Sequence, residues 1–219
     1  MLSVNIGDTA LALPKGFVYL ETIDPSIIQD MRYAGCDNFV GKPVPGYQTS
    51  RCIMTRKTAI ALSKVQNKLK PFDLSLKILD AYRPQKASNY FISWAQDDQD
   101  QKMKARYYPN IKKSDLFKKG YIAPCSAHTR GSTVDVTLVM IPSCKNAKPT
   151  NIEMGTLYDY FDSQSHTVND MISHEILTRR LYLKALMEAA GFKSIKTEWW
   201  HFTLQDEPYP DSDYDFDIQ

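Results

Sequence analysis

The sequence predicts an α+β fold in a single compact domain, residues 1–219, and three observations favour it. A chain of 219 residues suits one domain with a full core. Helix-like and strand-like patterns mix without the regular alternation of a parallel α/β sheet. The hydrophobic fraction of 43% and charged fraction of 24% are those of an ordinary globular protein.

The expected elements begin after a long irregular start. Prolines and glycines punctuate residues 1–50, which predicts mostly irregular chain that wraps the core, with one short helix within residues 22–33. Thr55 can cap a helix over residues 56–70, which Pro71 ends. Residues 74–80 alternate as a strand does. After Pro84 we expect a second helix that continues to about residue 107 and is polar from residue 96.

The second half of the chain has the clearer patterns. Residues 107–125 read as a loop with a short helix near 114–118, and the apolar run 134–140 predicts a buried strand. A third helix is expected over residues 169–190, with Gly191 as its left-handed stop. Residues 192–204 predict a hairpin or paired strand. The acidic tail from residue 208 predicts a solvated terminus or a final edge strand.

Two short segments carry side chains that can bind a metal ion. His128 and Asp135 share one segment, and a bend at Gly131 would let them converge. Glu198 and His201 share another. A catalytic zinc site needs three protein ligands, an open position for water and a base beside that water. Two histidines and the aspartate can be the ligands, with the glutamate as the base. A lone histidine is more often a core or surface residue, so both interpretations stand.

Three further points bear on this site. Residues three apart on a regular strand face opposite ways, so Glu198 and His201 can share a site only if the backbone turns or bulges between them. Arg83, held at a strand end, can stabilise an oxyanion, or it can simply pair with Asp80. The carboxylates among aromatic residues in 154–162 can bind an ammonium group, or they can cap turns.

Composition limits partners and compartment. A formal net charge of +2 gives no reason to expect a nucleic-acid partner, and no apolar run has the length of a membrane span. No signal peptide is expected, since the early apolar run 10–13 ends at a proline. The cysteines allow two disulfides in three pairings, or free thiols: Cys36, Cys52, Cys125 and Cys144. An exported protein whose leader has been removed and a cytoplasmic protein therefore both remain open.

Taken together, these motifs resemble the zinc D-alanyl-D-alanine dipeptidases of the VanX type. The matching stretches run in order along the chain: 31–34, 37–43, 80–84, 91–95, 107–110, 126–138, 154–156, 162–166, 198–202 and 206–210. The pattern Ser-x-His-x6-Asp followed by Glu-x-x-His, with an arginine upstream, is typical of the wider D-Ala-D-Ala metallopeptidase group. The other matches narrow it to the dipeptidase branch.

The resemblance implies a small central antiparallel sheet that carries the zinc site and is flanked by helices. It implies one Zn²⁺ per chain, bound by His128, Asp135 and His201. Glu198 would take a proton from a zinc-bound water and pass it to the leaving amine. Arg83 would stabilise the tetrahedral intermediate. The implied reaction is hydrolysis of the dipeptide D-Ala-D-Ala to two D-alanines.

The resemblance also assigns a substrate pocket to Tyr33, Ser126 and Asp159, with Asp159 as the partner of the free amino group. Ala127 follows Ser126 where relatives can have a second serine, so one pocket hydrogen bond could be missing. The alternatives are a D,D-carboxypeptidase acting on longer peptidoglycan peptides and a non-catalytic wall-binding or zinc-storage domain. Antibiotic resistance, D-alanine recycling and wall remodelling all stay open, as does the oligomeric state.

Overall fold

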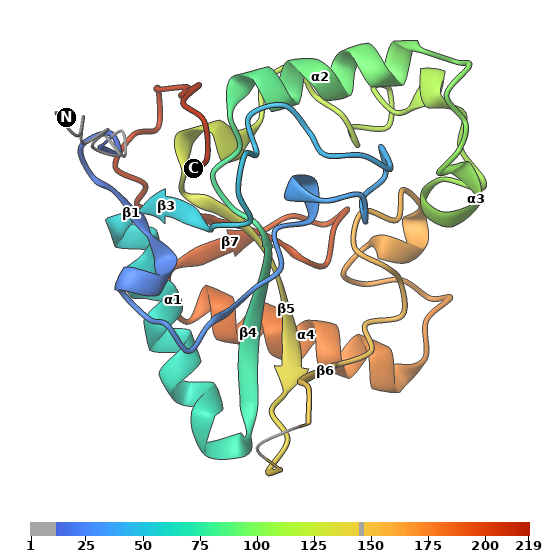
Figure 1. Ribbon diagram of the computed structural model, residues 1–219. Helices are drawn as coiled ribbons and strands as arrows, with labels where there is room; N and C mark the ends of the chain where they lie inside the picture. The colour runs from blue at the N-terminus through green and yellow to red at the C-terminus, as the bar shows by residue number, and fades with distance from the viewer. Residues whose placement is uncertain (1–11, 145–146) are drawn as a thin grey trace, which may run out of the picture.

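The computed structural model describes residues 12–144 and 147–219, so the first half of the early apolar run 10–13 lies outside the described residues. Among them, a six-stranded sheet runs through the middle of the molecule in the order β2-β4-β5-β8-β7, with β6 on β5 (Figure 1). The strands are β2 (Ile28–Gln29), β4 (Leu74–Asp80), β5 (Thr133–Met140), β6 (Thr150–Asn151), β7 (Phe192–Ser194) and β8 (His201–Leu204).

The sheet is antiparallel apart from the β2–β4 pair, which is parallel. A separate antiparallel pair joins β1 (Phe17–Tyr19) to β3 (Ile53–Thr55). Strand β5 is buried from Thr133 to Val139, because sheet neighbours flank it and other elements cover both its faces. Its sequence alternates, with Val134, Val136 and Leu138 on one face and Thr133, Asp135 and Thr137 on the other, so one face joins the core and the other carries a candidate metal ligand. The α+β prediction and the central antiparallel sheet are confirmed.

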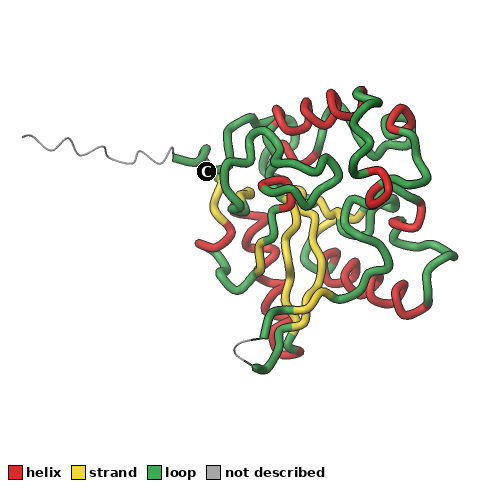
Figure 2. The backbone as a smooth tube through the Cα atoms, turned by 45° about the vertical axis from the view of Figure 1, so that its right-hand side comes forward, coloured by secondary structure: helices red, strands yellow, loops and turns green. Residues whose placement is uncertain are grey.

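Helices flank the sheet. Helix α1 (Arg56–Leu69) packs on β4, α4 (His174–Glu188) packs on β7, and the two helices contact each other. Helix α2 (Gln85–Gln96) and the short α3 (Lys104–Tyr107) lie at the opposite end of the molecule (Figures 1 and 2). The 3₁₀ turns are η1 (Leu20–Thr22), η2 (Arg32–Ala34), η3 (Lys70–Phe72), η4 (Lys113–Asp115), η5 (Ala127–Arg130) and η6 (Ser163–Ser165).

Two helices are shorter than the sequence predicts. Helix α2 ends at Gln96, where buried Lys113 donates from Nζ to the carbonyls of Trp94 and Asp97, each at 2.8 Å. This long-range cap satisfies carbonyls that another helical turn would have used. Helix α4 starts only after Ser173, whose hydroxyl accepts from the amide of Ile176. The short helix expected within residues 22–33 is wrong, because β2 pairs with β4 there and only η1 and η2 are helical.

The acidic tail is not a solvated terminus. Ile218 is fully buried and forms a parallel bridge with Tyr47. Asp217 pairs with Lys86 at 2.6 Å, and Asp213 accepts a hydrogen bond from Thr129 in η5. The tail therefore folds back over the body and supports the turn that carries His128. Most of residues 12–50 is loop, apart from β1, β2, η1 and η2.

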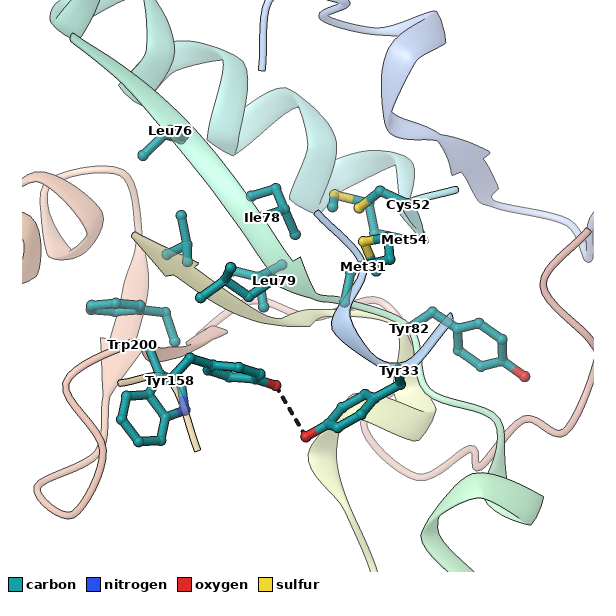
Figure 3. Close-up of a cluster of buried hydrophobic side chains, with 14 of the residues drawn as sticks. Met31, Tyr33, Cys52, Met54, Leu76, Ile78, Leu79, Tyr82, Tyr158 and Trp200 are labelled. Carbon is teal, nitrogen blue, oxygen red and sulfur yellow. Dashed lines mark hydrogen bonds between the residues drawn. The ribbon is translucent and has the colours of Figure 1, made fainter. Parts of the chain in front are cut away.

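One hydrophobic cluster joins the sheet, α1 and the loops beyond the sheet end. Figure 3 shows part of it, with Leu76, Ile78 and Leu79 of β4 beside Met31 and Met54. Within the described residues no helix combines the length and hydrophobicity that crossing a membrane requires. All four cysteines are free thiols, so neither of the two possible disulfides is formed.

Candidate functional site

Strand register places two of the predicted metal ligands side by side. In the antiparallel ladder, Asp135 of β5 lies opposite His201 of β8 on one side and opposite Asp80 of β4 on the other. Directly opposed residues on antiparallel strands project to the same face of the sheet. His201 Nδ1 and Asp135 Oδ1 are 3.1 Å apart. Residues that are 66 positions apart in sequence meet because they share one row of the sheet.

The third predicted ligand reaches the same point through a turn. Gly131 ends η5 with φ of +73°, and a Cβ on it would lie 2.3 Å from the ring of Phe17. Glycine is required on both counts. The bend folds the chain back as predicted, so that His128 Nε2 lies 3.4 Å from Asp135 Oδ1. Three ligand atoms, one each from His128, Asp135 and His201, lie within 4.8 Å of one another.

The carboxylate of Glu198 lies beside the three candidate ligands because the backbone turns between Glu198 and His201, as their spacing in the sequence requires. Residues 199–200 form a turn immediately before β8 begins at His201, so Glu198 is not on the strand. Trp199 donates its amide to Ser165, and Val136 donates its amide to the carbonyl of Trp200. Glu198 Oε2 consequently lies 3.5 Å from His201 Nδ1.

Outer hydrogen bonds orient two of the three candidate ligands, His128 and Asp135. His128 Nδ1 is 2.7 Å from the carbonyl oxygen of Ala81, which can only accept, so that nitrogen carries the proton. His128 Nε2 then presents a lone pair toward Asp135 Oδ1 at 3.4 Å, and either a proton or a metal ion can sit between these two acceptor atoms. The outer oxygen of Asp135 accepts from Tyr158 at 2.9 Å. The donor set of two imidazoles and one carboxylate therefore fits a divalent metal ion.

Arg83 lies beside the metal donors and is held by Asp80. Its Nε and Nη2 lie 3.0 and 2.9 Å from Asp80 Oδ2, and Tyr47 donates to the other oxygen of Asp80 at 2.7 Å. The guanidinium also lies 3.9 Å from Asp135 Oδ2. The pair with Asp80 is therefore present and its carboxylate is buried, while Arg83 also lines the cavity beside the metal donors.

A second group of polar residues faces the cavity from the loop between β6 and α4. Asp159 is buried and has a left-handed backbone with φ of +58°, which is uncommon outside glycine. Tyr33 of η2 donates its hydroxyl to Asp159 at 2.8 Å. Tyr158 lies 3.1 Å from the Tyr33 hydroxyl. Ser126, the cap of η5, accepts from the amide of His128 and also lines the cavity.

Helix α4 holds that loop with a buried cation. Arg180 is fully buried and donates to the carbonyls of Met154, Gln164 and His166 at 2.6–2.8 Å. Gly155 permits the close approach, since its φ is +84° and a Cβ there would lie 2.7 Å from Ile176. One guanidinium thereby fixes both ends of the segment that presents Asp159.

Burial and neighbouring charges separate the acidities of the carboxyl groups. Burial alone would raise the pKa of Asp135, but His128 and His201 hold that pKa well below its usual range. Burial raises the pKa of Glu198 to about 7. Burial, reinforced by the charge of Asp135, keeps the pKa of Asp159 well above its usual range. Burial would lower the pKa of His201, yet the hydrogen bond to Asp135 raises it.

One cavity of about 170 Å³ connects these groups, and all eight residues singled out from the sequence line it. Sequence reasoning did not assign its aromatic and apolar wall, which consists of Phe39, Phe91, Tyr121, Ile122, Phe161 and Ile195. Rings of Phe39 and Phe91 pack with centroids 4.8 Å apart. The supporting hydroxyl of Tyr158 was also missed. Such contacts join residues far apart in sequence and leave no local pattern.

Comparison with known proteins is consistent with this geometry. The family model described as D-ala-D-ala dipeptidase matches residues 14–219. The D-alanyl-D-alanine dipeptidase of Streptomyces coelicolor is 39% identical over 203 residues, covering 92% of this chain and 98% of that protein. The enzyme of the same name from Enterococcus faecalis is 38% identical over 206 residues, covering 94% of this chain and all of that protein.

A solved structure also aligns. It is a mutant of the vancomycin-resistance D,D-pentapeptidase VanY in complex with Zn(II), with 12% identity and a TM-score of 0.41 over 81% of this chain and 86% of that one. That TM-score is below 0.5, and we base no conclusion on it. The family model and the relatives at 38–39% identity are sufficient to assign the family of this chain. The chain belongs to the D-ala-D-ala dipeptidase family of metallopeptidases.

Proposed function

We propose that this protein is a zinc-dependent dipeptidase that hydrolyses D-Ala-D-Ala to two D-alanines. The observation that carries the proposal is the single cavity of about 170 Å³, with metal donors and Glu198 in its wall and the buried carboxylate of Asp159 in the same wall. Relatives at 38–39% identity bear the name D-alanyl-D-alanine dipeptidase, which supports the same substrate here.

The donor set supports zinc as the metal. His128 Nε2, Asp135 Oδ1 and His201 Nδ1 converge, and two imidazoles with one carboxylate form a common set for a catalytic zinc that keeps a position open. When bound, zinc supplies Lewis acidity that polarises a carbonyl and makes a water molecule acidic near neutral pH. His128 is fixed for this role by the Ala81 carbonyl, which holds its proton on Nδ1.

Glu198 acts as the general base and then as the general acid. Its carboxylate lies beside the donor set, 3.5 Å from His201 Nδ1. Burial raises its pKa to about 7, which is near the value that suits a group that must both take and give a proton at neutral pH. In this assignment Glu198 takes a proton from the attacking water. Glu198 then delivers that proton to the nitrogen of the leaving amine.

Arg83 stabilises negative charge that develops on the carbonyl oxygen. Its guanidinium is fixed by Asp80 through contacts at 2.9 and 3.0 Å, so little reorganisation is needed during the reaction. It lies over the rings of Tyr33 and Phe91, 5.2 Å from each centroid, which restricts it further. The bond to the buried Asp80 keeps the pKa of Arg83 high despite its burial, so the charge is permanent.

Asp159, Tyr33 and Ser126 recognise the substrate. We assign to Asp159 the free ammonium of the dipeptide, because a buried carboxylate that no cationic side chain of the described residues contacts gains most from a charged donor. Tyr33 orients that carboxylate through its 2.8 Å hydrogen bond. Pockets for drug-sized ligands run from about 300 to 1,000 Å³, so a cavity of about 170 Å³ favours a dipeptide over a longer wall peptide.

The test measures D-alanine release from D-Ala-D-Ala, with a D-Ala-D-Ala-terminated pentapeptide assayed in parallel. We expect turnover of the dipeptide, loss of it on zinc removal and recovery on zinc addition. Glu198→Ala should keep zinc and lose about 10²–10⁴-fold in kcat, the usual contribution of a general acid–base group. Glu175→Ala, which removes an exposed glutamate of α4 instead, is the matched control and should be fully active.

The outcomes separate the alternatives. Faster turnover of the pentapeptide would replace the dipeptidase with a D,D-carboxypeptidase. Zinc binding without turnover of either substrate would favour a binding or storage domain. Normal turnover in Glu198→Ala would remove Glu198 from the mechanism while leaving the substrate assignment intact.

A further inference from the structure

Four buried side chains form a continuous line of hydrogen-bonding oxygens through the wall of the site. It runs from Asp159 to Tyr33 at 2.8 Å, from Tyr33 to Tyr158 at 3.1 Å, and from Tyr158 to Asp135 at 2.9 Å. Figure 3 shows the hydroxyls of Tyr33 and Tyr158 pointing toward each other. The line begins at the proposed ammonium partner and ends on the outer oxygen of a metal ligand.

Packing does not explain the hydroxyl of Tyr158. The ring is buried and lies edge-on to Trp200 with centroids 5.4 Å apart, a role that phenylalanine would fill equally well. The hydroxyl instead reaches two acceptors, Tyr33 Oη and Asp135 Oδ2. A buried phenol is kept hydrogen-bonded because leaving its partner unsatisfied costs about 1–3 kcal/mol. The presence of the hydroxyl is therefore explained by its hydrogen-bond partners and not by packing.

Counting protons shows that Tyr158 cannot serve both acceptors at once. A phenol has one donor hydrogen. Tyr158 donates to Asp135, its ionised neighbour, whether or not Asp159 holds a proton. If Asp159 is also ionised, the two tyrosines have two protons for three contacts, and each proton goes to the stronger carboxylate acceptor. Tyr33 then donates to Asp159, Tyr158 donates to Asp135, and the 3.1 Å contact between the phenols holds no proton. Tyr33 is thus a second possible acceptor for the hydroxyl hydrogen of Tyr158, whereas the donor to Asp135 is Tyr158 itself.

We propose that Tyr158 is a positioning residue for the metal: its hydroxyl fixes the outer oxygen of Asp135 so that the inner oxygen faces the imidazoles of His128 and His201. This inference rests on the proposed zinc site. It assigns different roles to the two adjacent tyrosines of the line. Tyr158 supports metal binding, whereas Tyr33 supports the carboxylate that recognises the ammonium group.

The experiment measures zinc affinity, by competition with a chelator of known affinity, for the wild type, Tyr158→Phe, Tyr33→Phe and Tyr160→Phe. Tyr160 is the matched control, because it is the next tyrosine of the same loop and its hydroxyl makes no hydrogen bond among the described residues. The visible absorption of the Co²⁺-loaded proteins reports ligand geometry independently of activity. Thermal unfolding of the metal-free proteins checks that each variant folds.

We expect Tyr158→Phe to weaken zinc binding about 10–100-fold, the usual effect of removing an outer hydrogen-bond partner of a metal ligand, and to alter the Co²⁺ spectrum. Tyr33→Phe should leave zinc affinity and the Co²⁺ spectrum unchanged, because it removes only a competing acceptor, and should raise KM for the dipeptide. Tyr160→Phe should match the wild type throughout.

Two results would overturn the inference. One is a Tyr158→Phe protein with wild-type zinc affinity and Co²⁺ spectrum. The other is a Tyr33→Phe protein that loses as much zinc affinity as Tyr158→Phe, since the line would then act as one packed unit. Neither result depends on which substrate is cut. If the wild type binds zinc as expected but does not hydrolyse D-Ala-D-Ala, the proposed substrate fails while the role of Tyr158 is still decided.

Discussion

The two ends of the cavity are built by different physical means. At the metal end, Asp135 and His201 face each other across neighbouring strands, with Asp80 on the far side of Asp135. Backbone ladder hydrogen bonds fix their spacing. At the amine end, Asp159 lies on a loop that is held mainly by side chains, among them the buried guanidinium of Arg180 and the hydroxyl of Tyr33.

This difference predicts how each end responds to mutation. A ligand on a sheet row can be removed without moving the row, because the ladder bonds are made by the backbone. A loop that side-chain contacts hold loses part of its shape when a side chain making several of those contacts is removed. Substitutions of the sheet-row ligands should therefore change chemistry with little change in stability, whereas changes behind the amine end should change both.

The largest effect is expected from His201→Ala. It removes a metal ligand, so kcat/KM for D-Ala-D-Ala should fall at least about 10³-fold, because the metal provides several kcal/mol of transition-state stabilisation. Zinc affinity, measured by chelator competition, should fall with it, while the metal-free protein unfolds at close to the wild-type temperature. Unfolding at a much lower temperature would contradict the independence of the sheet row.

Arg180→Met should destabilise the protein by about 3 kcal/mol, because three buried carbonyls lose charged donors. Denaturant unfolding measures this, and KM for the dipeptide should rise as Asp159 loses its position. Arg179→Met is the matched control, since Arg179 is the adjacent arginine but is partly exposed and pairs with Glu175. If Arg180→Met keeps wild-type stability and KM, the loop does not depend on α4.

Glu198 gives the metal-free protein a pH-dependent stability of about 3 kcal/mol. Burial raises its pKa to about 7 from an ordinary 4.5, so between these values the folded state binds more protons than the unfolded state. Stability from this group is therefore present at low pH and is lost as pH rises toward 7. In denaturant unfolding, we expect the free energy of unfolding of Glu198→Gln to depend less on pH between 4.5 and 7 than that of the wild type. An unchanged pH dependence would contradict this assignment.

Asp159→Asn tests the amine end with the smallest change. Asparagine tolerates the left-handed backbone and can still accept from Tyr33. Loss of the charge should raise KM for D-Ala-D-Ala by roughly 10- to 100-fold, the value of one charge-assisted hydrogen bond of about 1.5–3 kcal/mol. Zinc affinity should stay at the wild-type value. Reduced zinc affinity here would mean that the two ends are not separable.

Residues close in sequence explain what could be predicted. His128, Gly131 and Asp135 lie within eight positions, and the glycine supplies the bend between the two ligands. Glu198 and His201 lie within four, with a turn between them. The strands β4 and β5 follow from alternation in residues 74–80 and from the mostly apolar stretch 134–140. Such signals are local, so no partner needs to be known.

Helix ends and supporting contacts could not be predicted in this way. Helix α2 ends early because Lys113 reaches back to its last carbonyls. The acidic tail is ordered because Ile218 finds a buried place beside Tyr47. In each case the contact joins residues that are far apart in sequence, and the residues next to them in sequence show no pattern that predicts it.

The amino-acid sequence alone determined the class of fold, the central strands and the residues able to bind a metal ion, because periodicity, glycine bends and ligand types are properties of short segments. Tertiary structure decided that Asp135 faces His201, that Arg83 is held by Asp80, and that Tyr33 reaches Asp159 from 126 residues away. Register between strands and the burial of charged groups arise only when distant segments pack. The reason is that both depend on which surfaces the packed segments remove from water.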